Sequence, residues 1–178
     1  MGLILVVDLE ATCCELGSIH PEQMEIIEVG AAWCTAEGSV LETFQSYVRP
    51  IKNPTLTTFC HKLTGINQEA VDSALDWADV APTFAAFVSR HNGQSWASWG
   101  AYDRRQIERE CLLHQVANPM GDLSHINLKS IFAKSRKIKQ VGMAKALNIV
   151  GLPLDGSHHR ALSDVLNIAK LLPYCRTT

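Results

Sequence analysis

The first third of the chain is dominated by apolar runs that predict β-strands. Leu3 to Leu9 is almost wholly apolar, which indicates a buried central strand. Segments 25–35 and 40–48 predict two further strands, and Gly38 marks the hairpin turn between them. Three consecutive strands joined by short connections predict a meander at the start of the fold.

Helical periodicity alternates with short apolar runs in the rest of the chain. Pro82 is expected to open an amphipathic helix that runs through Ser89, because proline favours the first helical position. The other expected elements are helices over 57–64, 102–114, 140–150 and 160–172, and strands over 95–99 and 126–128. A meander followed by alternating strands and helices predicts an α/β fold, with a mixed five-stranded sheet flanked by helices. We expect the whole chain, 1–178, to form one domain.

Charge does not mark the protein as a general binder of polyanions. The chain has 16 basic and 18 acidic residues, for a formal net charge of −2. Binding of two divalent cations would make the loaded protein mildly positive, so a nucleic-acid substrate is compatible with this balance. The segment 123–154 contains several lysines but no acid. Such a segment is either a solvated surface or, beside a metal site, a track for a phosphate backbone.

The cysteines and the N-terminal sequence predict a cellular environment. Six cysteines occur without a CxxC pair, which argues against a disulfide framework and a zinc site, so we expect reduced thiols. The N-terminal apolar run is short and lacks a basic region, and therefore predicts a buried strand and not a signal peptide. No apolar run reaches transmembrane length. We expect a cytoplasmic protein with no membrane partner.

Acidic residues at three separate elements suggest a metal site. Asp8 and Glu10 are two positions apart on a strand, so both side chains point to one face. Two such carboxylates repel each other strongly when buried unless a cation neutralises them, and oxygen ligands suit Mg²⁺ or Mn²⁺. Asp103 begins a predicted helix, and His159 and Asp164 begin another. Each acid alone is better explained as a strand-end or helix charge, but the set together suggests a metal-dependent phosphodiesterase.

Three motifs in this order resemble those of the DEDDh family of 3′–5′ exonucleases. They are DLEAT at 8–12, WGAYDRRQ at 99–106 and HHRALSD at 158–164. Outside them, FCHKLTGI at 59–66, INLKSIFA and GMAKALNIVGL resemble the Eri-like and KapD-like branch of that family. The resemblance covers nearly the full length. It implies a ribonuclease H-like fold and an enzyme that removes nucleotides from the 3′ end of a nucleic acid.

The same resemblance assigns roles to individual residues. It implies that two divalent cations, Mg²⁺ or Mn²⁺, are held by Asp8, Glu10, Asp103 and Asp164. The family spacing His-x-Ala-x-x-Asp selects His159 as the general base and leaves His158 as a neighbour that contacts the substrate. The substrate contacts expected from the Eri-like branch are Phe59 and Tyr102 against the terminal base, Thr12 at the terminal sugar, and Leu63 and Ile66 as a wall of the pocket. Packing of Tyr102 against the sheet is an alternative.

The leading functional hypothesis is a 3′–5′ exonuclease that acts on single-stranded RNA and releases 5′-mononucleotides. The same chemistry on single-stranded DNA is an alternative, and so is a non-catalytic RNA-binding scaffold. The sequence Asp155-Gly156-Ser157 before the histidines predicts a flexible loop, which would let the base close only on substrate.

Overall fold

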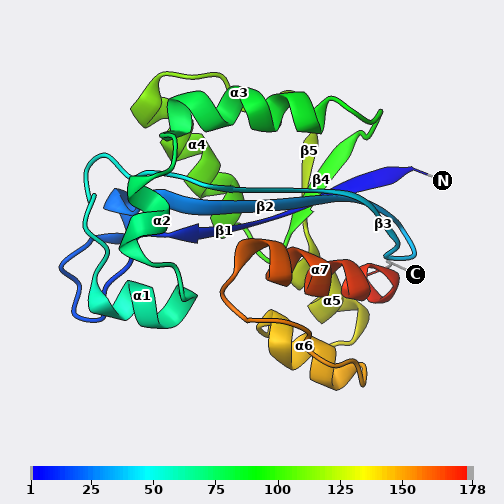
Figure 1. Ribbon diagram of the computed structural model, residues 1–178. Helices are drawn as coiled ribbons and strands as arrows, with labels where there is room; N and C mark the ends of the chain where they lie inside the picture. The colour runs from blue at the N-terminus through cyan, green and yellow to red at the C-terminus, as the bar shows by residue number, and fades with distance from the viewer. Residues whose placement is uncertain (1, 176–178) are drawn as a thin grey trace.

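The central strand predicted at the N-terminus organises a mixed sheet in which five strands are hydrogen-bonded (Figure 1). The computed structural model describes residues 2–175. The strands are β1 (Leu3–Ala11), β2 (Ile26–Thr35), β3 (Val40–Tyr47), β4 (Ser95–Ser98) and β5 (Ser124–Asn127). Their order is β3-β2-β1-β4-β5, with antiparallel pairing among β1, β2 and β3 and parallel pairing of β1 with β4 and of β4 with β5. The predicted mixed five-stranded sheet is therefore confirmed.

Helices cover both faces of this sheet. They are α1 (Thr58–Thr64), α2 (Gln68–Asp72), α3 (Trp77–Val88), α4 (Tyr102–His114), α5 (Leu128–Ser135), α6 (Met143–Ile149) and α7 (Ala161–Leu171), with short 3₁₀ turns at Pro21–Gln23 and Leu172–Tyr174. In Figure 1, α3 and α4 lie on one side of the sheet, α5, α6 and α7 lie on the other, and α1 and α2 lie beside one end. Among the described residues, no helix combines the length and apolar character that a membrane crossing requires.

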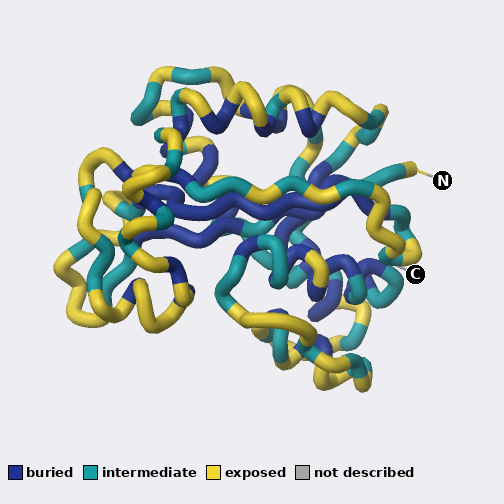
Figure 2. The backbone as a smooth tube through the Cα atoms, in the orientation of Figure 1, coloured by how far each residue is buried: buried dark blue, intermediate teal, exposed yellow. Residues whose placement is uncertain are grey.

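Alternation along β1 divides the core into two layers. Leu5, Val7 and Leu9 pack in the cluster that contains α3 and α4, whereas Val6 packs with α7. Figure 2 shows β1 and β2 among the most buried parts of the molecule. Asp8 lies two residues after Val6 and so shares its face. The acidic pair of β1 is thereby directed toward the α7 side of the sheet.

The expected start of the third helix was wrong. Helix α3 begins at Trp77, and Pro82 lies inside it. The Asp76 side chain caps the helix by accepting a hydrogen bond of 3.0 Å from the Ala78 N–H. Trp77 and Val80 are buried in the core, so capping and burial offset the hydrogen bond that Pro82 cannot donate. The prediction was wrong because Pro82 was taken as the first helical residue, the position that proline favours.

Two short helices were not expected. Helix α2 spans only five residues, and α5 follows β5 directly, where the sequence predicted only a brief strand. The Asn127 side chain accepts a hydrogen bond of 3.0 Å from the Ser130 N–H and so caps α5. Short capped helices of this kind lack the repeated apolar periodicity by which longer helices are recognised.

Candidate active site

Three elements bring the predicted site residues to one cavity of about 250 Å³. Its lining contains all five residues expected to be catalytic, namely Asp8, Glu10, Asp103, His159 and Asp164. The strand β1 supplies Asp8 and Glu10, the first turn of α4 supplies Asp103, and the first turn of α7 supplies Asp164, with His159 in the segment just before α7. Residues that are far apart in the sequence therefore form one acidic site.

The turn between β4 and α4 places Asp103. Gly100 has a φ of +133°, a backbone conformation that residues other than glycine rarely adopt. Helix α4 then begins at Tyr102, and Asp103 lies in its first turn, where the helix dipole favours a negative charge. The carboxyl group is nearly buried and faces the cavity.

Burial and mutual repulsion dominate the electrostatics of this cavity. Burial, reinforced by the charges of Asp103, Glu10 and Asp164, raises the pKa of Asp8 well above its ordinary value. Burial and the charges of Asp164 and Glu28 raise the pKa of Glu10 to about 8. Burial also raises the pKa of Asp103 to about 6, although a hydrogen bond from Ser98 opposes the rise. The protein alone does not supply enough positive charge to keep Glu10 fully ionised at neutral pH.

The donor atoms in the cavity fit divalent cations. One ligand oxygen each from Asp8, Glu10 and Asp164 lies within 4.8 Å of the others. An oxygen-only set of this charge suits Mg²⁺ or Mn²⁺. A cation there would also relieve the repulsion that raises the carboxyl pKa values. His158, His159 and Asp164 form a second overlapping group within the same distance.

The two histidines occupy different positions relative to Asp164. Their rings stack with centroids 4.0 Å apart. The Nδ1 atom of His158 lies 3.0 Å from both carboxylate oxygens of Asp164. His159 has a φ of +64° and donates its backbone N–H to Asp164 Oδ2 at 3.0 Å, so that its imidazole is left free at the cavity. Burial, together with the neighbouring His158, lowers the pKa of His159, which keeps a neutral imidazole available at pH 7.

The loop that leads to the histidines is anchored at its start. The Asn167 side chain accepts a hydrogen bond of 3.0 Å from the Asp155 N–H and donates one of 2.8 Å to the Asp155 carbonyl. Lys170 also forms an ion pair of 2.6 Å with Asp155. The start of this segment is thus fixed to α7, and closure of the histidines on substrate stays a prediction.

The predicted substrate contacts separate into two groups. Tyr102 and His158 line the cavity, and the Tyr102 hydroxyl is buried without a hydrogen-bond partner among the described residues. The four outside the cavity lining are Thr12, Phe59, Leu63 and Ile66.

The side chains outside the cavity lining differ in accessibility. Phe59 and Leu63 are exposed on α1, whereas Ile66 is 1% exposed and packs with Cys60. The Thr12 hydroxyl accepts the Glu25 N–H at 3.0 Å. Contacts of these residues with a substrate stay predictions.

Five lining residues were not assigned to the site from the sequence. Leu9 and Ile168 are apolar residues of β1 and α7, and the other three are Trp99, Gly142 and Met143. The Trp99 indole donates a hydrogen bond of 3.0 Å to the Val141 carbonyl, which ties the second motif to the segment before α6. The only sequence signals were the tryptophan at the start of WGAYDRRQ and the phrase GMAKALNIVGL, neither of which specifies a chemical role.

Comparison with known proteins agrees with this geometry. The family model described as "Exonuclease" matches residues 5–172. The probable 3′-5′ exonuclease KapD of Bacillus subtilis (strain 168) is 32% identical over 174 residues, which cover 94% of this chain and 82% of KapD. ERI1 exoribonuclease 2 of Mus musculus is 30% identical over 190 residues, covering 94% of this chain. The chain spans only 28% of the length of that mouse protein.

Solved structures share the fold. The nuclease domain of 3′hExo, described as a DEDDh family member bound to rAMP, superposes with a TM-score of 0.85 at 28% identity, covering 95% of this chain and 88% of that chain. The cell-death related nuclease 4 (CRN-4) superposes with a TM-score of 0.81 at 25% identity, covering 96% of this chain and 62% of that chain. The sheet order and the flanking helices are thus those of the ribonuclease H-like fold of DEDDh exonucleases.

Proposed function

Because the chain belongs to the exonuclease family, in its DEDDh group, we propose that it hydrolyses single-stranded RNA from the 3′ end and releases 5′-mononucleotides. The observation that carries this proposal is the convergence of four carboxylates and a histidine pair on one cavity. An exonuclease of this family needs such a set to bind two divalent cations and to activate water.

The chain's own residues would divide the chemistry among them. When bound, two divalent cations lower the pKa of a water molecule and stabilise the negative charge that develops on the phosphate. Asp8 and Glu10 would hold them from a rigid strand, and Asp103 and Asp164 from the first turns of two helices. His159 would take the proton from the attacking water, a step worth roughly 10²–10⁴-fold in rate.

Two observations favour RNA over DNA as the substrate. Relatives that share 27–32% identity include exoribonucleases by name, among them the mouse protein and 3′-5′ exoribonuclease 1 of Mus musculus. A structural relative with a TM-score of 0.86 is described as recognising the 3′ end of a histone mRNA stem-loop. Structures described as exonuclease I with single-stranded DNA share only 14–15% identity with this chain, so they support the fold alone.

The decisive experiment compares RNA and DNA oligonucleotides of the same sequence, labelled at the 5′ end, with Mg²⁺, with Mn²⁺ and with excess EDTA. We expect a ladder of shortened RNA, slower shortening of DNA, and no reaction in EDTA. The Asp103→Ala variant should be folded and nearly inactive, because a lost ligand misplaces a cation. Faster digestion of DNA would favour the deoxyribonuclease alternative. RNA binding without cleavage would favour the non-catalytic scaffold.

We also propose that the protein acts in the cytoplasm. The six cysteines are all free thiols, as expected of a chain in a reducing compartment. Fractionation of cells that express the protein with a small epitope tag would test this location.

A further inference from the structure

A fifth buried acid lies beside the proposed active site without lining it. Glu28 on β2 is fully buried and pairs across the strands with Glu10. Its charge contributes to the raised pKa values of Asp8 and Glu10, so it adds to the repulsion within the site. A buried carboxylate at such a position is costly unless strong hydrogen bonds compensate for it.

The compensation comes mainly from the residue that follows the histidine pair. Arg160 donates to both Glu28 oxygens, from Nε at 3.2 Å and from Nη2 at 3.1 Å. The Ala161 N–H donates to Glu28 Oε2 at 3.0 Å, and Gln45 Nε2 donates to Oε1 at 2.6 Å. Two parallel bonds between a guanidinium and a carboxylate fix orientation as well as distance.

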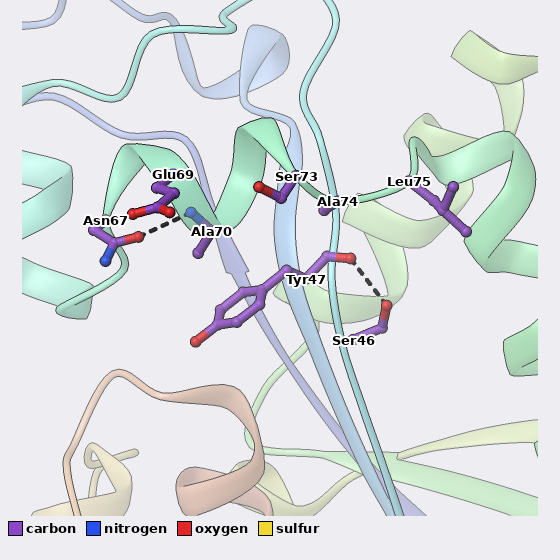
Figure 3. A pocket seen from close by; sticks show the side chains of 8 residues that line it. All are labelled: Ser46, Tyr47, Asn67, Glu69, Ala70, Ser73, Ala74 and Leu75. Atoms are coloured by element: carbon purple, nitrogen blue, oxygen red, sulfur yellow. Dashed lines mark hydrogen bonds between the residues drawn. The ribbon is translucent and has the colours of Figure 1, made fainter.

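Tyr47 on β3 also binds the guanidinium. Arg160 Nη2 donates to the Tyr47 hydroxyl at 2.5 Å, and its guanidinium lies 5.5 Å from the centre of the Tyr47 ring. Figure 3 shows the Tyr47 ring extending past Ala70 of α2, where it lines a neighbouring cavity of about 600 Å³. The arginine is therefore held by groups from two strands.

These contacts determine where α7 begins. Arg160 is the N-cap residue of α7, yet its side chain makes no capping hydrogen bond. Glu28 supplies the cap from the neighbouring strand by accepting the first N–H of the helix. Gly30, on the same face of β2, allows the close approach, since a Cβ there would lie 2.5 Å from the Ala161 carbonyl carbon. Any side chain at position 30 would push the helix away from the sheet.

The first turn of α7 carries Asp164, and the preceding residues are the two histidines. The Asp164 N–H bonds to the Arg160 carbonyl at 2.9 Å, so the position of the carboxylate depends directly on that of Arg160. Gly30 is also the cross-strand partner of Asp8. We propose that Glu28 is a positioning residue, which acts through Arg160 and the Ala161 amide to fix Asp164 and the histidine pair against the carboxylates of β1. This inference rests on the proposed function and adds a residue to it.

The test compares two buried glutamates at the same end of β2. Glu25 is also almost fully buried, but its carboxylate accepts the backbone N–H groups of residues 51–53 and makes no bond to α7. The variants Glu28→Gln and Glu25→Gln each remove one buried charge with little change in shape. For each we would measure thermal unfolding, Mn²⁺ affinity of the protein alone by calorimetry, and kcat and KM with a short RNA.

Both variants should lose thermal stability, but only Glu28→Gln should weaken Mn²⁺ binding and lower kcat, each by about 10–100-fold. The KM for RNA should change little, because the substrate contacts remain. Arg160→Lys keeps the positive charge without the paired bonds and should show a smaller loss in the same direction. If Glu28→Gln does not fold, the Mn²⁺ affinity and kcat of Arg160→Lys test the positioning role instead, because Arg160 is partly exposed.

A lower melting temperature with unchanged Mn²⁺ affinity and unchanged kcat, in whichever of these two variants folds, would overturn the positioning role. Failure of the proposed function would appear differently. A wild-type protein that binds Mn²⁺ but degrades no RNA would disprove the proposed exoribonuclease activity, while the Mn²⁺ measurement would still decide whether Glu28 positions Asp164.

Discussion

At the scale of single residues, Glu10 is where stability and function conflict most directly. Its pKa is raised from 4.5 to about 8, mainly by burial and then by neighbouring acids. Since the unfolded chain ionises near the ordinary value, this residue stabilises the fold fully only below about pH 4.5. That contribution is lost as the pH rises through about 8. Without cations the site is therefore destabilised at pH 8.

We predict that Glu10→Gln raises the melting temperature in EDTA at pH 8 by on the order of 5 °C, and changes it little at pH 4.5. In this variant a neutral amide replaces a carboxylate that is buried and repelled by the neighbouring acids. Added Mn²⁺ should stabilise the wild type and have much less effect on the variant. Differential scanning calorimetry with exposed Glu15→Gln as control would check this. A variant less stable than wild type at pH 8 in EDTA would contradict the electrostatic argument.

The histidine pair gives a second prediction at this scale. His159→Ala should lower kcat by roughly 10²–10⁴-fold and leave Mn²⁺ affinity almost unchanged, because a base is lost and no ligand is removed. His158→Ala should have a smaller effect on kcat, although it removes the 3.0 Å contact with Asp164. Single-turnover assays of both variants would decide. A greater loss of kcat in His158→Ala than in His159→Ala would mean that His158 is the general base.

At the scale of secondary-structure elements, the segment from α5 to α6 carries exposed lysines and leads to Gly142 and Met143 of the cavity lining. Lys134, Lys137 and Lys139 are exposed. Arg136 is not part of this free surface, because its guanidinium lies 4.2 Å from the centre of the Phe132 ring and donates to the Tyr174 carbonyl. Arginine at this position therefore joins α5 to the C-terminal turn, a role that its sequence context did not reveal.

We predict that replacing Lys134, Lys137 and Lys139 together by glutamine spares binding of a dinucleotide and weakens binding of longer single-stranded RNA. The dependence of log affinity on log salt should fall by up to about 2 units, or about 0.7 for each lost phosphate contact. A matched variant with three glutamines at Arg49, Lys52 and Arg90 controls for total charge. Equal salt slopes in the wild type and the lysine variant would mean that this surface is merely solvated.

The elements also explain what the sequence could predict. The strands and the helix from Tyr102 were predicted well because apolar periodicity and glycine turns are local signals. The acids were assigned from their spacing and family motifs, and the structure brings them to one cavity. The start of α3 was missed because Pro82 was taken as the helix start in place of the local cap by Asp76. The capping of α7 by Glu28 was missed because it depends on a tertiary contact. A strand glutamate that caps a distant helix has no local sequence pattern.

At the scale of the whole molecule, the proposed activity requires a free chain end. We predict that a linear RNA with a 3′-hydroxyl is degraded and that a 3′-phosphate slows the reaction strongly, because extra charge would enter an acidic cavity. A circular RNA of the same sequence should resist. Gel analysis of the three substrates side by side would check this, with alkaline hydrolysis as the size standard. Efficient cutting of the circle would show endonuclease action.

The order of the site residues along the chain has a consequence for synthesis. Asp8 and Glu10 lie on β1, whereas Asp164 lies on α7, which follows all five strands along the chain and docks on β1 and β2. A chain synthesised only as far as the strands has an incomplete set of ligands. The cation site, and any cleavage that depends on it, therefore has to wait until α7 has been synthesised and has docked on the sheet.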